Sequence, residues 1–234
     1  MSPSPLNVPA RWISSARPPN PAARILEAAV LAGARLSTHL GNGAHALLPR
    51  HANYIQMQMA DDRLMASMIC DGHHLPAYFF KNALRAKGRT RVILVTDATA
   101  AAAAPPGKYT LGSLRIEAGD DGMVKLPGTP YLVGSSATMD MAISNASKFA
   151  GIPLSTAIRM GTVNPARLFR NFACALSPGE RADLVIFNLD QDSPPGAPRR
   201  SPIGEADGDA GEAGGMIKIE KVFLEGEPVF HSCR

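Results

Sequence analysis

Histidine and aspartate residues follow three apolar stretches of this chain. His39 lies near the end of the stretch RLSTHL, Asp71 follows RLMASMIC together with His73 and His74, and Asp97 follows RVILVT. Imidazole nitrogen and carboxylate oxygen are ligands that a zinc-like divalent ion takes from proteins. The residue types therefore favour a metal site at the ends of these stretches.

Each of these residues also has a structural interpretation. A single histidine beside a turn is more often structural or exposed than a ligand, and Asp97 could cap the segment that follows it. A carboxylate placed directly after a run of apolar residues is nevertheless costly to bury without a partner. The other histidines outside the 71–74 segment are interpreted as surface residues: His45, His51 and His231.

Helices are predicted between these stretches. The segment PAARILEAAVLAGARL predicts a helix that begins near Pro21 and stops at Gly33, and PAYFFKNALRAKG predicts a helix closed by Gly88. Apolar strands that alternate with helices predict an α/β fold, either a parallel sheet or a barrel of βα units. In such a barrel the active site forms at the carboxyl ends of the strands, which is where the candidate residues stand.

Two segments of the chain have the composition of poorly ordered polypeptide. Residues 1–22 are rich in proline and form a loose leader, and residues 191–215 form a disordered insertion rich in Pro, Gly, Ala, Asp and Glu. The other predicted elements, in chain order, are a loop over 99–112, a hairpin over 113–128 around Asp121-Gly122, a helix from Thr138 or Asp140 to Gly151, helices over 155–160 and 165–170, a strand in 179–189, and a hairpin over 216–230 turned at Glu225-Gly226.

Composition excludes several classes of protein. The 234 residues are 45% hydrophobic, with a net charge of +4 and scattered Lys and Arg, which argues against a nucleic-acid partner despite a pI near 9.1. The apolar runs are too short to span a bilayer, so no membrane segment is expected. Three widely spaced cysteines indicate reduced thiols and a cytoplasmic location: Cys70, Cys174 and Cys233.

Several segments together resemble the N-acetylglucosamine-6-phosphate deacetylase family of the amidohydrolase superfamily. STHLGNGAH resembles that family's Thr-His-Leu-x-Asn-Ala-Met segment, ICDGHHLP its Asp-Gly-x-His segment, and LVTDAT its strand-eight motif. YLVGSSATMD, RMGTVNPARLF and GERADLVIFN resemble its later motifs, in the same order, so the likeness runs from about residue 32 to residue 188. Several motifs in order are far more specific than one.

The resemblance implies a role for particular residues. His39 would be the metal ligand, Asp97 the catalytic acid and base, and Arg50 the residue that grips the phosphate of the substrate. The remaining substrate contacts that it implies are Asn42, Gly43, Asp71, Gly72, His73, His74, Leu132, Val133, Gly134 and Ser135. The implied reaction is metal-assisted hydrolysis of the N-acetyl amide of N-acetylglucosamine 6-phosphate, with zinc as the expected ion and an amino-sugar phosphate and acetate as products. A homodimer is also implied.

The resemblance covers only the later part of that family. It implies the last three strands of a TIM-like barrel over 23–178 and part of a small β-sandwich over 179–234. The family's His-Leu-Glu-Gly-Pro and Gly-His-Ser ligand segments have no counterpart, so an N-terminally truncated chain with an incomplete ligand set is expected. The pocket also departs from the family at Gly43-Ala44 and at His51. The alternatives are therefore a non-catalytic remnant, a half-enzyme that needs a second chain, or an amidohydrolase for a different acylated amine.

Overall fold

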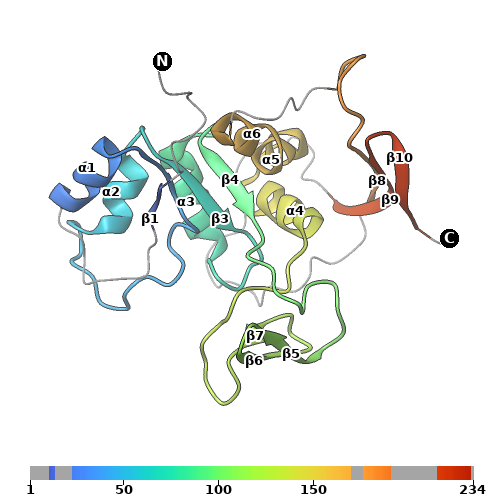
Figure 1. Ribbon diagram of the computed structural model, residues 1–234. Coiled ribbons are helices and arrows are strands. Elements are labelled where there is room, and N and C mark those ends of the chain that lie inside the picture. Colours follow the sequence, from blue (N-terminus) through green and yellow to red (C-terminus); the bar gives the residue numbers. More distant parts are fainter. Residues whose placement is uncertain (1–10, 14–22, 170–175, 191–214, 233–234) are drawn as a thin grey trace, which may run out of the picture.

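A four-stranded parallel sheet forms the centre of the molecule. The computed structural model describes residues 11–13, 23–169, 176–190 and 215–232 (Figure 1). The strands are β1 (Arg11–Ile13), β2 (Ala34–Ser37), β3 (Met65–Ile69) and β4 (Val92–Val95), and they lie in the order β1-β2-β3-β4. The predicted α/β class is thus confirmed, and neighbouring strands in the sheet are neighbours in the sequence.

The strand β1 corrects the prediction for the leader. Residues 1–22 are predicted to be a loose leader without a helix or a central strand, yet Arg11–Ile13 pairs in parallel with β2 as an edge strand. Because β1 is at the edge of the sheet, prolines before and after it remove no ladder hydrogen bond from a central strand. The sheet consequently has one strand more than the three predicted, while the rest of the leader lies outside the described residues.

The predicted helices are confirmed. They are α1 (Ala23–Leu31), α3 (Ala77–Lys87), α4 (Met139–Ala150), α5 (Leu154–Gly161) and α6 (Val163–Phe169). Gly88 and Gly151 end α3 and α4 with positive φ, the conformation for which glycine is suited. None of the described helices is long and apolar enough to cross a membrane.

A further helix, α2 (Tyr54–Ala60), is absent from the sequence prediction. Its signal is Asn53, whose side chain accepts hydrogen bonds from the backbone N–H groups of Ile55 and Gln56. This is the usual N-cap arrangement. A helix of seven residues with alternating polar and apolar side chains shows little periodicity, so the cap was the only available indication.

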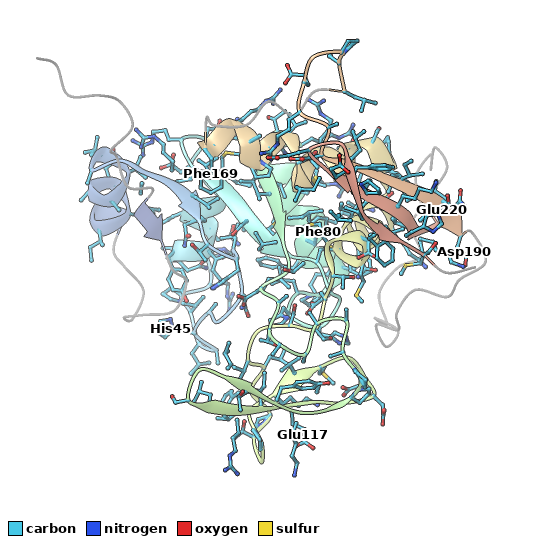
Figure 2. All side chains as sticks on the ribbon, turned by 45° about the vertical axis from the view of Figure 1, so that its right-hand side comes forward. His45, Phe80, Glu117, Phe169, Asp190 and Glu220 are labelled. Atoms are coloured by element: carbon cyan, nitrogen blue, oxygen red, sulfur yellow. The ribbon has the colours of Figure 1, made fainter. Side chains whose placement is uncertain are left out.

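The main core lies between the sheet and the helices α3, α4 and α5. Figure 2 shows Phe80 of α3 in this interior, where it is 1% exposed. Apolar side chains of β3 and β4 face it, and Asn145 of α4 donates a hydrogen bond of 2.9 Å to the carbonyl of Cys70 at the end of β3. The helix α4 is therefore tied to the edge of the sheet where the candidate residues stand.

A small antiparallel sheet follows β4. It consists of β5 (Gly107–Leu111), β6 (Leu114–Ala118) and β7 (Val124–Lys125), with its own apolar cluster around Ile116. The predicted hairpin around Asp121-Gly122 is confirmed, but the predicted loop over 99–112 is wrong where β5 forms. There the turn at Gly112 lets Lys108–Leu111 pair with β6. In Figure 2, Glu117 marks this sheet at a distance from the main body.

A second antiparallel sheet closes the described chain. It has the order β10-β9-β8 and is formed by β8 (Leu184–Asp190), β9 (Met216–Leu224) and β10 (Glu227–His231). The predicted strand and the hairpin at Glu225-Gly226 are confirmed. Ile217 of β9 joins the main core and donates its backbone N–H to Ser144 of α4 at 3.1 Å. Residues 191–214 of the predicted insertion lie outside the described residues.

Candidate functional site

Three adjacent strands bring the predicted residues to one edge of the sheet. His39 follows β2, Asp71 to His74 follow β3, and Asp97 follows β4. Ile69 is paired with Val95 in the parallel register, so Asp71 and Asp97 each stand two residues beyond a matched pair. In Figure 1 the arrow of β4 points toward the β5–β7 sheet, which therefore lies on the same side as this edge.

The backbone around His39 is held in an uncommon conformation. Its φ is 30°, in the region that non-glycine residues rarely adopt. The side chain of Ser67 on β3 accepts a 2.8 Å hydrogen bond from the N–H of His39, and the carbonyl of Ser67 accepts one of 2.8 Å from Leu40. Ser67 thus fixes the backbone from which the His39 side chain projects. The sequence did not indicate this role, because the two residues are far apart in the chain.

The end of β2 carries buried polar atoms that have no hydrogen-bond partner among the described residues. Within the described ranges, Nδ1 of His39 and the hydroxyls of Ser37 and Thr38 are buried without a hydrogen bond. Such atoms are unusual in folded proteins, where ordered water or a bound ion commonly supplies the missing partner. A ring nitrogen in this state fits a metal ligand. Residues 11–13, 23–169, 176–190 and 215–232 contain no cluster of three or more His, Cys, Asp or Glu side chains placed to hold an ion.

Asp71 and His74 form a buried pair at the end of β3. Their side chains are 5% and 3% exposed, and Oδ2 of Asp71 lies 2.6 Å from Nδ1 of His74. The other carboxylate oxygen accepts hydrogen bonds from the N–H groups of His73 and His74 at 2.9 and 3.0 Å. Burial alone would raise the pKa of Asp71, but the hydrogen bonds from His74 and His73 outweigh it and lower that pKa.

Asp97 is joined to the predicted loop 132–135. Its φ is 52° and its side chain is exposed, while its carbonyl accepts a 2.8 Å hydrogen bond from the N–H of Ser135. The hydroxyl of Ser135 donates to the carbonyl of Thr96 at 2.5 Å. Gly134 is pressed against this segment, since a Cβ there would lie 2.8 Å from the carbonyl oxygen of Asp97. The structure thus brings Asp97 and Ser135 together.

The other end of this loop is attached to β7. Val133 donates its N–H to the carbonyl of Val124 at 2.9 Å, and Leu132 forms an isolated bridge with Lys125. The loop 132–135 therefore connects the end of β4 to the small sheet.

The turn of the β6–β7 hairpin also reaches the site, which the sequence did not indicate. Ser136 donates its hydroxyl to the carbonyl of Gly122 at 2.6 Å, and a Cβ on Gly122 would lie 3.5 Å from Nε2 of His73. A hydrogen bond from the N–H of Met123 lowers the pKa of the neighbouring Asp121. His73 is thus flanked by this turn, while Gly72 beside it adopts φ 83°.

The predicted substrate residues after β2 lie on a loop. Asn42 closes a turn by donating its N–H to the carbonyl of His39 at 2.9 Å, and Gly43 continues it with φ 61°. Arg50 is exposed on the same loop.

The prediction that His45 is a surface residue is wrong, because this residue is half-buried and its ring is hydrogen-bonded to Tyr54. His51 and His231 are exposed as predicted.

The sequence of the chain matches that of a known protein family. The sequence pattern of the amidohydrolase family matches residues 24–229, most of the chain. The chain belongs to the amidohydrolase family. The resemblance that the motifs indicate is therefore confirmed.

Several members of the amidohydrolase family are similar to this chain. An N-acetylgalactosamine-6-phosphate deacetylase of Escherichia coli O157:H7 is 34% identical over 164 residues, which is 69% of this chain and 42% of that protein. The N-acetylglucosamine-6-phosphate deacetylase of Homo sapiens is 33% identical over 176 residues, or 70% of this chain and 42% of the human protein. The chain thus spans less than half the length of these relatives.

Solved structures of the same family agree with this likeness. The N-acetyl-D-glucosamine-6-phosphate deacetylase of Mycobacterium smegmatis, a D267A mutant in complex with N-acetyl-D-glucosamine-6-phosphate, matches with a TM-score of 0.69 and 31% identity. The match covers 86% of this chain and 47% of that one. The corresponding enzyme of Thermotoga maritima has a TM-score of 0.69 and 26% identity, covering 89% of this chain and 50% of that one.

Proposed function

We propose that this chain takes part in hydrolysis of the N-acetyl amide of an amino-sugar 6-phosphate. The observation that carries the proposal is the grouping of His39, the Asp71–His74 pair and Asp97 beyond three adjacent strands of an amidohydrolase chain. N-acetylglucosamine 6-phosphate is the substrate that we favour, and N-acetylgalactosamine 6-phosphate is the close alternative, because both names occur among the similar proteins.

His39 would hold a divalent metal ion, with zinc as the expected ion. Its buried Nδ1, which has no hydrogen-bond partner in the part of the chain that the structure describes, supports this assignment. When bound, such an ion would polarise the amide carbonyl and acidify a water molecule. The strained backbone of His39, fixed by Ser67, would keep the ring in one orientation for this purpose.

Asp97 would move the proton. Its exposed carboxylate at the edge of the sheet could accept a proton from the attacking water and then deliver it to the departing amine. The attachment of its carbonyl to Ser135 would hold the carboxylate in place while Leu132 to Ser135 line the sugar.

The remaining residues would bind the substrate. The Asp71 carboxylate can only accept a hydrogen bond, so the proton of the His74 ring resides on Nδ1. Nε2 of His74 is then left to bind a sugar hydroxyl.

Gly72 and His73 would line the same pocket. Asn42 and Gly43 would meet the sugar, and the guanidinium of Arg50 would bind the phosphate through its fork of donors.

We further propose how the chain is divided. Residues 23–178 would form one side of a TIM-like barrel with β2, β3 and β4 as its closing strands, and 179–234 would belong to a small β-sandwich. Reduced thiols and the metabolic substrate suit a cytoplasmic enzyme, for which we propose a homodimer.

The proposal is tested by measuring acetate release from both N-acetylhexosamine 6-phosphates, with the protein loaded with zinc and after chelation. We expect release that depends on the metal and is abolished in Asp97→Asn, with binding of glucosamine 6-phosphate kept. Absence of both turnover and sugar phosphate binding would contradict the proposal and favour a non-catalytic remnant. Sugar phosphate binding without turnover would instead favour a half-enzyme that needs a second chain.

A further inference from the structure

The first residue of α2 reaches back to the loop that carries Arg50. The hydroxyl of Tyr54 lies 2.9 Å from the backbone nitrogen of His45 and 2.9 Å from Nδ1 of the same residue. The two rings also meet edge to face, with centroids 5.8 Å apart. Tyr54 is 2% exposed, so the loop is tied to a buried group rather than to another surface side chain.

The cap of α2 fastens the same loop a second time. Asn53, which is 6% exposed, donates its side-chain N–H to the carbonyl of Pro49 at 3.0 Å while its oxygen caps the helix. Arg50 is the residue that follows Pro49. One attachment thus precedes Arg50 at His45, and the other adjoins it, so the backbone of this stretch has little freedom. Figure 2 shows His45 on this loop, on the side of the molecule where the β5–β7 sheet lies.

The helix that provides both attachments is itself fixed. The side chain of Gln58 donates to the carbonyl of Tyr54 at 3.0 Å within α2. At the far end of the helix, Nζ of Lys87 on α3 donates to the carbonyls of Gln58 and Asp61 at 3.1 and 2.7 Å. Because Gln58 and Lys87 are 1% and 0% exposed, α2 is anchored to the core through its carbonyl end.

We propose that Tyr54 is a positioning residue, which through His45 holds the 41–53 loop so that Arg50 is presented to the phosphate of the substrate. The role of Arg50 rests on the proposed function, whereas the hold on the loop rests on these contacts alone. Tyr54 is too deeply buried to touch the substrate, and its effect is therefore transmitted through the loop. A preorganised guanidinium avoids the ordering cost of capturing a phosphate from a mobile loop.

The experiment compares Tyr54→Phe with Tyr78→Phe, a control in which the hydroxyl is removed from an exposed tyrosine of α3. Two quantities are measured for each folded protein: the rate of trypsin cleavage after Arg50, and the dissociation constants of glucosamine 6-phosphate and glucosamine. We expect Tyr54→Phe to speed cleavage and to weaken binding of the phosphorylated sugar by about three- to tenfold, the usual value of a lost hydrogen bond. Binding of glucosamine, kcat of any turnover, and all values for Tyr78→Phe should stay at the wild-type level.

The outcomes separate this proposal from the proposed function. Cleavage of Tyr54→Phe at the wild-type rate would overturn the hold on the loop, and faster cleavage with unchanged phosphate affinity would overturn the link to Arg50. If the wild-type protein binds glucosamine and glucosamine 6-phosphate equally, the proposed function fails, and the trypsin rates alone decide the role of Tyr54. His45→Ala, which leaves the buried tyrosine in place, should change the rates in the same direction and replaces Tyr54→Phe if that variant does not fold.

Discussion

The carboxylate of Asp71 and the imidazole of His74 lie 2.6 Å apart at the end of β3, and both are nearly inaccessible to solvent. The same carboxylate accepts two backbone N–H groups, so it shapes the turn that carries His73 and His74 as well as the orientation of one ring. This single residue therefore joins the local fold of the turn to the geometry of the candidate site.

Asp71→Asn should destabilise the protein by about 1–3 kcal/mol at neutral pH, because an amide cannot replace both functions of the carboxylate. The pKa of Asp71 is lowered in the folded state, so its stabilisation is present above the ordinary value of 3.8 and is lost as the pH falls through the folded value. The difference in free energy of unfolding between wild type and variant should therefore shrink below about pH 4. Denaturant titrations at several pH values measure it.

The control for this variant is Asp120→Asn, which makes the same chemical change at an exposed position of the β6–β7 turn. Its free energy of unfolding should match that of the wild type within about 0.5 kcal/mol. A penalty for Asp71→Asn that is unchanged from pH 7 to pH 3 would contradict the assignment of the carboxylate as the stabilising group.

Gly134→Ala should displace the loop that binds the backbone of Asp97. A Cβ at this position would lie 2.6 Å from Cγ2 of Thr99 and 2.8 Å from the carbonyl oxygen of Asp97, and φ is 60°. We expect a loss of about 2–4 kcal/mol in stability, since overpacking adds to the cost of the left-handed backbone. Thermal or denaturant unfolding would measure it.

Gly128→Ala separates the cost of overpacking from the cost of the left-handed backbone. Its φ is 75°, but a Cβ there would meet no atom of the described residues within 4 Å. It should therefore cost only the backbone strain of about 1 kcal/mol. Equal losses for the two variants would refute the close contact between Gly134 and Asp97.

Gly41→Ala tests the contact between the turn after His39 and α3. The added Cβ would lie 2.5 Å from the ring of Phe79, and the φ of Gly41 is 90°. We expect a loss of about 2–3 kcal/mol in the wild-type background, and a smaller added loss when Phe79 is also changed to alanine. A double-mutant cycle on the free energy of unfolding gives the coupling, and a coupling of zero would argue against the contact.

The sequence predicts those parts of the fold that depend on local signals. Gly88 and Gly151 mark helix ends, and the apolar runs before His39, Asp71 and Asp97 mark the strands whose carboxyl ends meet. Because these strands pair in parallel, their carboxyl ends lie at the same edge of the sheet, so the edge that carries the site could be predicted as well.

Features that depend on distant partners could not be predicted in this way. The helix α2 is short, and it is stabilised by Lys87 from α3 rather than by its own periodicity. The hydrogen bond from His39 to Ser67 joins the end of β2 to β3. The contact of the β6–β7 turn with His73 depends on where the separate β5–β7 sheet lies. These contacts join residues that are far apart in the sequence, so local residue types and spacing do not indicate them; the Asn53 cap is a local signal for α2 alone.

Because of Lys87, the free energy of unfolding of the protein should vary with pH in the alkaline range. Burial, followed by the charge of Arg91, lowers the pKa of its ammonium group from 10.5 to about 8. Between these values the unfolded chain binds more protons than the folded one, so the free energy of unfolding should rise from about pH 8 to about pH 10. Lys87→Met should remove this rise, whereas Lys148→Met, on the exposed side of α4, should keep it. Denaturant titrations at pH 7.5, 8.5 and 9.5 for the three proteins decide the matter, and a rise of equal size in Lys87→Met would assign it to another group.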